Sequence, residues 1–411
     1  MTFEPQISDQ AFVWIWLPGE FNPIVAGLIK ASGDIYQFRY AKSYLSNPLS
    51  IPLSPFELPL QAATFTPTGL NKIHSCLRDA APDAWGRRVI NNQFNILEAS
   101  ELYYMLNSGS NRIGGLDFQF SSSSYEPRND NHIELKELMS AAEYVEKNLQ
   151  LPKALQFALL HGTSIGGARP KALLDSTKRK LEYIAKFSST TDIYNIIKAE
   201  YIGMRLAKLA GINVANVSMT SVLKKDVLLV ERFDRLIINN RKTRKLMLSA
   251  LSILSLNELE ARYASYVDFA DIIRQKFSFP QKNLEELFKR LVFNVLIGNN
   301  DDHARNHAAF WDGKHLTLTP AYDICPQPRV GFEATQAMLI GGKDGNLSKI
   351  SNVLSVCHVF QLDKEQAKDI IESMVQIITK NWELVCEEAR LSSMEKNQLW
   401  QKSILNPFCF Q

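Results

Sequence analysis

Residues 299–306 gather carboxylates, amides and a histidine directly after an apolar segment, and a further carboxylate, Asp323, follows a short hairpin-like stretch. Phosphoryl transfer needs one carboxylate to orient or deprotonate the attacking hydroxyl. It also needs oxygen ligands that hold Mg²⁺ against the phosphates. This spacing predicts Asp301 as the catalytic base, with Asn306 and Asp323 as the metal ligands. The alternative is a purely structural turn, for which two asparagines, two aspartates and a histidine in a row are more polar groups than expected.

A zinc site must be weighed against magnesium at the same place. His303 and His307 stand four residues apart and could share one helix face. The sequence contains no His-Glu-x-x-His, however, and the residues between the two histidines suit a loop. We therefore favour magnesium.

Glycines and basic residues at positions 162–171, Gly-Thr-Ser-Ile-Gly-Gly-Ala-Arg-Pro-Lys, precede an apolar run. Glycines let backbone N–H groups turn toward an anion, and the basic side chains add positive charge, so the segment predicts a phosphate-binding loop. It is neither Gly-x-Gly-x-x-Gly nor a Walker A sequence, and a glycine-rich turn is the alternative. The candidate contacts in this loop are Ser164, Ile165, Gly166, Gly167, Ala168, Arg169 and Lys171.

Two further segments fit a nucleotide site. Lys186 interrupts an apolar strand, where an unpaired lysine is costly to bury, and in kinases such a lysine holds phosphates and pairs with a helix glutamate. Glu200 is the candidate partner, and an outward-facing lysine is the alternative. A second apolar strand ends in a charged segment that would be the hinge in a two-lobed kinase. Its adenine contacts would be Glu231 and Phe233.

The elements around these segments suggest an α+β protein. Short strands are expected at residues 13–17, 25–29 and 35–40, followed by loops and a helical exit to about 107. A polar segment at 121–132 reads as a loop. Helices are expected at about 134–149 and 192–210, strands near 171–174, 181–187, 213–222 and 226–231, and mostly helix beyond 246. We predict three domains: a β-rich part at 1–90, a nucleotide-binding lobe at 91–232, and a mostly helical lobe at 233–411.

Composition narrows the class of protein. The 411 residues suffice for two or three cores, and a formal charge of +3 argues against a general nucleic-acid-coating protein. The five cysteines are scattered and odd in number, which suggests free thiols in a reducing compartment. The N-terminus has no signal-peptide pattern, and no run of about 18 apolar residues occurs. These features predict a cytoplasmic protein.

Taken in order along the chain, these segments resemble the HipA family of serine/threonine kinase toxins, and the resemblance covers nearly the whole chain. The segments that carry it are residues 13–19, 38–41, 82–86, 164–171, 230–235, 297–306 and 320–323, together with Lys186.

The resemblance implies a two-lobed, protein-kinase-like fold with a small β-rich N-terminal subdomain and a mostly helical C-terminal lobe. It implies ATP- and Mg²⁺-dependent phosphorylation of protein serine or threonine, with translation-related substrates such as aminoacyl-tRNA synthetases. The partner would be a small helix-turn-helix antitoxin of the HipB type that binds DNA. Ser164 aligns with a serine that the family autophosphorylates, which moves the phosphate loop and silences the kinase. The resemblance also implies that His303 contacts the nucleotide.

Two other functions remain open at this point. A small-molecule kinase on a related fold would use the same Asp, Asn and Asp. An inactive kinase-like module would act only through its antitoxin on DNA, although an intact set of Lys186, Asp301, Asn306 and Asp323 argues against it.

Overall fold

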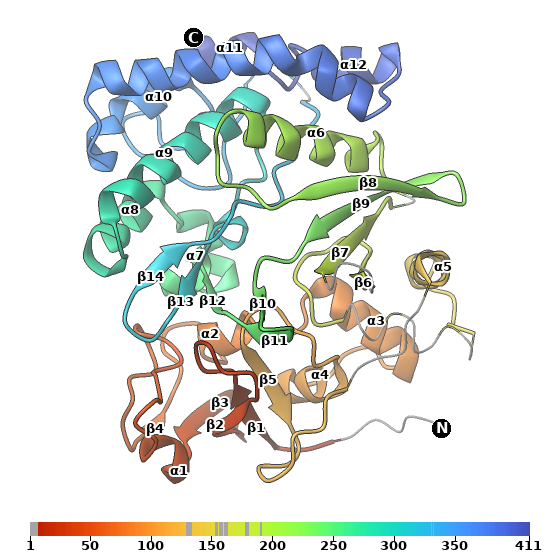
Figure 1. Cartoon of the computed structure of the whole chain (residues 1–411), viewed down its shortest axis with the longest axis vertical. Helices are drawn as coiled ribbons and strands as arrows, with labels where there is room; N and C mark the ends of the chain where they lie inside the picture. The colour runs from red at the N-terminus through yellow and green to blue at the C-terminus, as the bar shows by residue number, and fades with distance from the viewer. Residues whose placement is uncertain are drawn as a thin grey trace. The chain divides into compact units, whose positions relative to one another are not determined.

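The computed structural model describes residues 7–128, 134–152, 155, 159, 163–176, 181–189, 191–329, 331 and 333–411. Figure 1 shows the course of the whole chain, which divides into two compact units. The first unit comprises residues 1–191, 221–248 and 310–314, and the second comprises 192–220, 249–309 and 315–411. Residues 1–90 therefore share one unit with the segment that carries the phosphate loop. The three-part division by sequence stays a prediction.

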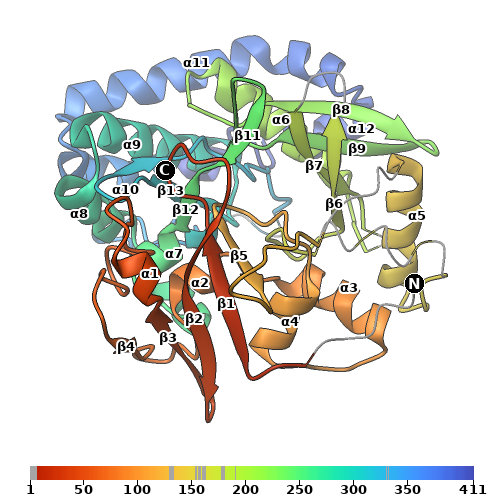
Figure 2. The same ribbon diagram turned by 60° about the horizontal axis from the view of Figure 1, so that its bottom comes forward.

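The first unit contains a five-stranded sheet with the order β4-β3-β2-β1-β5, whose first strands are visible at the front of Figure 2. Residues Gln10 to Val13 of β1 alternate between partly exposed and buried, which is the pattern of a strand with one face on a core, whereas the following Trp14 and Ile15 are both buried. The strand predicted at 35–40 is confirmed, and those predicted at 13–17 and 25–29 are present with shifted bounds, whereas β4 and β5 were not predicted. The bounds are β1 (Gln10–Ile15), β2 (Ile24–Ser32), β3 (Ile35–Tyr40), β4 (Thr64–Phe65) and β5 (Leu116–Gln119).

Helices of the first unit follow the sheet. The predicted helical stretch before residue 107 is two helices, because Asn95 takes a left-handed conformation and ends the first of them. The helix predicted at 134–149 is confirmed with shorter bounds. Residues 121–128 form the predicted loop, and 129–132 lie outside the described residues. The helices are α1 (Lys42–Leu45), α2 (Ser75–Arg78), α3 (Ala84–Phe94), α4 (Glu101–Asn107) and α5 (Leu135–Glu146).

A second sheet of the first unit carries the predicted nucleotide strands. β7 pairs antiparallel with both β6 and β9, and a core cluster that includes Trp85, Leu138 and Ala185 joins this sheet to α3 and α5. The hairpin β10–β11 follows β9 and was not predicted. The bounds are β6 (Lys171–Ser176), β7 (Leu181–Phe187), β9 (Lys225–Glu231), β10 (Arg235–Ile238), β11 (Arg241–Arg244) and β12 (Leu246–Ser249).

The second unit is mostly helical, as predicted for the C-terminal third. Its central helix, α9, contacts α8, α10 and α11, and nearly all of its last three turns are buried. Figure 1 shows α6 beside the long helix α11. The helices are α6 (Ile196–Leu209), α7 (Ala250–Ile253), α8 (Tyr266–Lys276), α9 (Pro280–Ile297), α10 (Ile350–Ser355), α11 (Lys364–Glu388) and α12 (Ser393–Leu399). Among the described residues, no helix is long and apolar enough to cross a membrane.

Short strands and 3₁₀ turns make up the remaining elements. β8 (Val217–Val222) begins four residues later than predicted, and the strands β13 (Ala308–Trp311) and β14 (Leu316–Leu318) form the hairpin-like stretch before Asp323. 3₁₀ turns occur at Glu258–Tyr263, Ala304–Asn306, Cys357–Phe360 and Pro407–Phe410. All five cysteines are buried, and they are free, which agrees with the predicted free thiols.

Candidate active site

The segment after α9 is folded into one tight turn that brings Asp301 and Asn306 together. α9 ends at Gly298, which adopts the left-handed conformation typical of a helix C-cap. The amide Nδ2 of Asn306 donates to the backbone carbonyl of Asp301 at 3.1 Å, while the Asp301 side chain is exposed. Backbone bonds from His303 to Asp301 (2.9 Å) and from Asn306 to His303 (2.8 Å) complete the turn. An exposed carboxylate on a fixed backbone suits a group that must meet a substrate hydroxyl.

Asp323 follows a residue that is bound to the same turn. The hydroxyl of Tyr322 donates to the carbonyl of Arg305 at 2.7 Å. Asp323 itself has φ of +59°, a backbone conformation that non-glycine residues rarely adopt and that clusters at functional sites. Because Asn306 donates through Nδ2, its Oδ1 is the atom suited to a cation. An amide oxygen and a carboxylate are hard oxygen ligands, which fit Mg²⁺.

Asp302, the neighbour of Asp301, points into the core. The hydroxyl of Tyr266 donates to its carboxylate, and His307 Nε2 lies 2.9 Å from it. Burial alone would raise the pKa of Asp302, but His307 and Tyr266 hold it below its ordinary value. Asp302 therefore stays charged in the core and anchors the turn to α8.

The two histidines have different surroundings. The Nε2 of His307, an atom that could bind zinc, is engaged with Asp302. The Nδ1 of His303 is shielded from solvent and has no hydrogen-bond partner within the described residues. Nor does the described part of the chain contain a group of three or more His, Cys, Asp or Glu side chains that could hold a metal ion. The choice between zinc and magnesium at this turn stays a prediction.

The predicted phosphate loop is described from Thr163 onward, and Gly162 lies outside the described residues. Residues 163–165 are buried and residues 166–169 are exposed, so the loop has a fixed base and an accessible tip. The ammonium of Lys171 donates to the carbonyl of Gly166 at 2.5 Å and closes the loop on itself. Gly167 has φ of +113°, a backbone conformation that residues with a Cβ rarely adopt, so this position favours glycine.

Lys186 and Glu200 belong to different units. Lys186 lies in β7, opposite Lys171 in β6 and Leu228 in β9, and is partly exposed. Glu200 lies on α6 and is 4% exposed. Their pairing stays a prediction.

The predicted hinge alternates between partly exposed and buried side chains. Glu231 and Phe233 are partly exposed. Arg232 and Asp234, which alternate with them, are buried, with 5% and 2% of their surface exposed. This period of two is that of an extended chain, whose successive side chains point to opposite sides. The Phe233 ring packs edge-to-face on Phe310 at a centroid distance of 6.0 Å.

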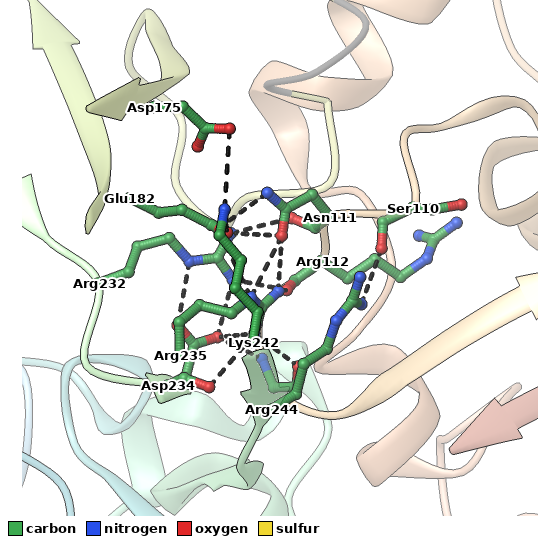
Figure 3. A network of polar contacts seen from close by, with 11 residues as sticks. Ser110, Asn111, Arg112, Asp175, Glu182, Arg232, Asp234, Arg235, Lys242 and Arg244 are labelled. Carbon is green, nitrogen blue, oxygen red and sulfur yellow. Dashed lines mark hydrogen bonds and ion pairs between the residues drawn. The ribbon is translucent and has the colours of Figure 1, made fainter. Parts of the chain in front are cut away.

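The buried side of the hinge belongs to a charged network that sequence reasoning missed (Figure 3). The carboxylate of Asp234 accepts hydrogen bonds from Arg232 Nη2 at 2.8 Å, from Arg235 Nη1 at 3.0 Å and from the backbone N–H of Gly114 at 2.7 Å. Arg232 Nη2 also donates to the carbonyl of Arg112 at 2.7 Å. The network therefore ties the hinge to residues 111–114, which precede β5.

Glu182 of β7 joins the same network. Its carboxylate accepts Lys242 Nζ at 2.8 Å and Asn111 Nδ2 at 2.9 Å. Burial alone would raise the pKa of Glu182, but Arg232 and Arg235 lower it to about 2. Two sequence signals pointed toward this network: a charged residue in an otherwise apolar strand, as for Lys186 in the same strand, and the charged segment that follows β9.

Replacing Glu182 by Gln is expected to destabilise the protein by about 3 kcal/mol at neutral pH, because it removes one of the two carboxylates that balance the buried Arg232 and Arg235 and leaves only Asp234. The folded pKa is depressed from 4.5, so this carboxylate stabilises the fold above about pH 4.5 and ceases to do so as the pH falls toward 2. Urea unfolding at a series of pH values should therefore show a shallower acid loss in Glu182→Gln.

Asp175 provides the matched control for this measurement. It is 3.9 Å from the same Lys242, but its side chain is 44% exposed. Asp175→Asn should change stability by less than about 1 kcal/mol. Equal losses in the two variants would show that burial of Glu182 is not what makes it important.

The sequence of this chain matches two family models and several known proteins. The HipA N-terminal domain model matches residues 17–119, and the HipA-like C-terminal domain model matches residues 163–382. The chain is 25% identical over 320 residues to the serine/threonine-protein kinase toxin HipA of Shewanella oneidensis, covering 72% of this chain and 70% of that protein. It is 27% identical over 206 residues to a putative kinase of Haemophilus influenzae, covering 45% of this chain and 60% of that one.

A solved structure agrees with the fold. The HipA chain in a complex of Shewanella oneidensis HipA, HipB and operator DNA superposes with a TM-score of 0.72 at 19% identity, covering 96% of both chains. This match confirms the predicted fold class, a mixed α+β fold of HipA type. The C-terminal family model alone spans more than half of the chain. The resemblance seen in the sequence is thus confirmed, and the chain belongs to the HipA family.

Proposed function

We propose that this protein is an ATP- and Mg²⁺-dependent serine/threonine protein kinase and the toxin of a toxin–antitoxin pair. The observation that carries the proposal is the turn after α9, where Asn306 binds the Asp301 backbone and Tyr322, next to Asp323, binds the Arg305 backbone. One exposed carboxylate beside an amide oxygen and a second carboxylate is the minimal set for phosphoryl transfer.

In this proposal Asp301 orients the substrate hydroxyl and accepts its proton as the oxygen attacks the γ-phosphorus. The bond from that phosphorus to the bridging oxygen breaks, and ADP leaves. Asn306 and Asp323 would hold Mg²⁺, which neutralises charge developing on the phosphates. Asp302 keeps the turn in place through Tyr266 and His307.

The nucleotide contacts are proposed from the first unit and the catalytic turn. The exposed loop tip offers backbone N–H groups and the Arg169 side chain to phosphates, and the partly exposed Glu231 and Phe233 suit adenine. The full proposed set is Ser164, Ile165, Gly166, Gly167, Ala168, Arg169, Lys171, Lys186, Glu231, Phe233, His303, Asn306 and Asp323.

Autophosphorylation at Ser164 is part of the proposal and has a structural requirement. The Ser164 side chain is 1% exposed, and its hydroxyl has no hydrogen-bond partner in the part of the chain that the structure describes. A phosphate there would bring about −1.5 to −2 charge into a buried place. Modification therefore requires the base of the loop to leave its position.

The biological setting is proposed from the relatives. Because the Shewanella oneidensis HipA structure contains HipB and operator DNA, we propose a small HipB-like antitoxin as the partner, with DNA contacted through it. The substrate would be a translation-related protein such as an aminoacyl-tRNA synthetase, and the place of action the cytoplasm.

Incubation with γ-labelled ATP, Mg²⁺ and a cell lysate tests the activity. Label in a protein band other than the kinase supports the proposal. Label appearing only in the small-molecule fraction would point to a metabolite kinase instead. Nucleotide binding without turnover would indicate a kinase-like module that acts only through its antitoxin.

A further inference from the structure

The start of α3 lies directly against the predicted phosphate loop, although the two are far apart in the chain. The indole N–H of Trp85 donates to the carbonyl of Lys171 at 3.0 Å, across 86 residues of sequence. The backbone N–H of Trp85 donates to the carbonyl of Gly167 at 3.4 Å. One residue thus binds both the tip and the end of the loop.

The next residue brings the two backbones into close contact. A Cβ at Gly86 would lie 1.9 Å from the carbonyl oxygen of Thr163 and 2.8 Å from its carbonyl carbon. Distances this short leave no room for any side chain, so position 86 must be glycine while the loop stays in place. The hydroxyl of Thr163 also accepts the backbone N–H of Gly109 at 3.1 Å, which fixes the start of the loop a second time.

The helix start that contacts the loop is buried and well packed. Trp85 is 1% exposed and belongs to a core cluster with residues of α5, β6, β7 and β9. Asp83 caps α3 by accepting the N–H of Gly86. The loop is thus bound to a well-packed helix start, within the segment that matches the HipA N-terminal domain, while the loop belongs to the C-terminal match.

We propose that Trp85 and Gly86 are positioning residues that hold the loop in the conformation able to bind nucleotide phosphates. They touch no nucleotide themselves. The N-terminal domain would then set the affinity for ATP through this contact. The inference rests on the proposed function for its effect on ATP, but the contact itself can be tested without nucleotide.

Two variants separate the contact from general stability. Gly86→Ala adds one methyl group that must displace Thr163, yet alanine favours the helix more than glycine by about 1 kcal/mol, so α3 should persist. Trp85→Phe removes the indole N–H but keeps an aromatic ring in the core. Ala84→Gly, at an exposed position of the same helix, is the matched control because it removes a methyl group that faces solvent.

The measurement is hydrogen exchange of peptides covering residues 163–171 in the full chain without nucleotide, followed by titration with ATP and Mg²⁺. Gly86→Ala and Trp85→Phe should speed exchange in the loop about tenfold or more while leaving peptides of β1–β3 unchanged, and Ala84→Gly should match wild type. ATP affinity should fall about tenfold in the first two variants. Unchanged loop exchange in both would overturn the inference. If the wild type binds no ATP, the proposed function fails, and the exchange result still decides the contact.

Discussion

Asp301→Asn is expected to slow phosphoryl transfer about 10²–10⁴-fold, the range that positioned general bases contribute. Asparagine keeps the size of the side chain but cannot accept the proton of the attacking hydroxyl. The Asp301 side chain is exposed, and its backbone carbonyl still receives Asn306, so the fold of the turn should be retained. The measurement is single-turnover transfer from γ-labelled ATP, with the melting temperature determined in parallel.

Asp302→Asn is the informative comparison, since it makes the same chemical change one residue away. This side chain is buried between Tyr266 and His307, so its replacement should lower the melting temperature and disturb the turn indirectly. Transfer by Asp301→Asn at the wild-type rate would show that Asp301 is not the base. A thermal shift in Asp301→Asn as large as in Asp302→Asn would show a structural role instead.

Asp323→Ala should abolish measurable transfer, a loss of at least about 10³-fold, because a bound metal ion stabilises the transition state by several kcal/mol. The binding of Mg²⁺ in the presence of ATP should weaken along with the rate. Titrating Mg²⁺ in the transfer assay measures this, and wild-type turnover with unchanged Mg²⁺ dependence would contradict the assignment.

The backbone at position 323 calls for a second variant. Because Asp323 has φ of +59°, alanine there adds backbone strain to the loss of charge. Asparagine tolerates the left-handed region better, so Asp323→Asn isolates the missing charge. Tyr322→Phe serves as the control: it removes only the bond to the Arg305 carbonyl and should slow transfer much less than either change at 323.

Residues that lie close in the chain were predictable, because one local fold brings them together. Asp301 and Asn306 fall in a single turn, and the short strands before Asp323 return the chain to it. The strands around Lys186 and the long helix α9 were also recognisable from their apolar patterns. Their functional roles remain predictions for the assays above.

Contacts between distant segments left little trace in the sequence. Asp234 and Gly114 are 120 residues apart, and the sequence around one gives no indication that it contacts the other. Trp85 was recognised only as part of a family motif, because an indole that binds a backbone carbonyl looks in sequence like any buried tryptophan. The strand β5 was missed because four residues carry too little alternation to be read.

The discontinuous first unit has a consequence for the order in which a ribosome makes this protein. Residues 310–314 belong to that unit, and the indole N–H of Trp311 donates to the carbonyl of Pro52 at 2.8 Å across 259 residues. Residues 1–191 are therefore synthesised long before residues 310–314 of the same unit, and the helices between them in sequence are synthesised first. Asp323 is synthesised just after Trp311. A chain cut short by interrupted translation before Trp311 would therefore lack both this closing contact and Asp323.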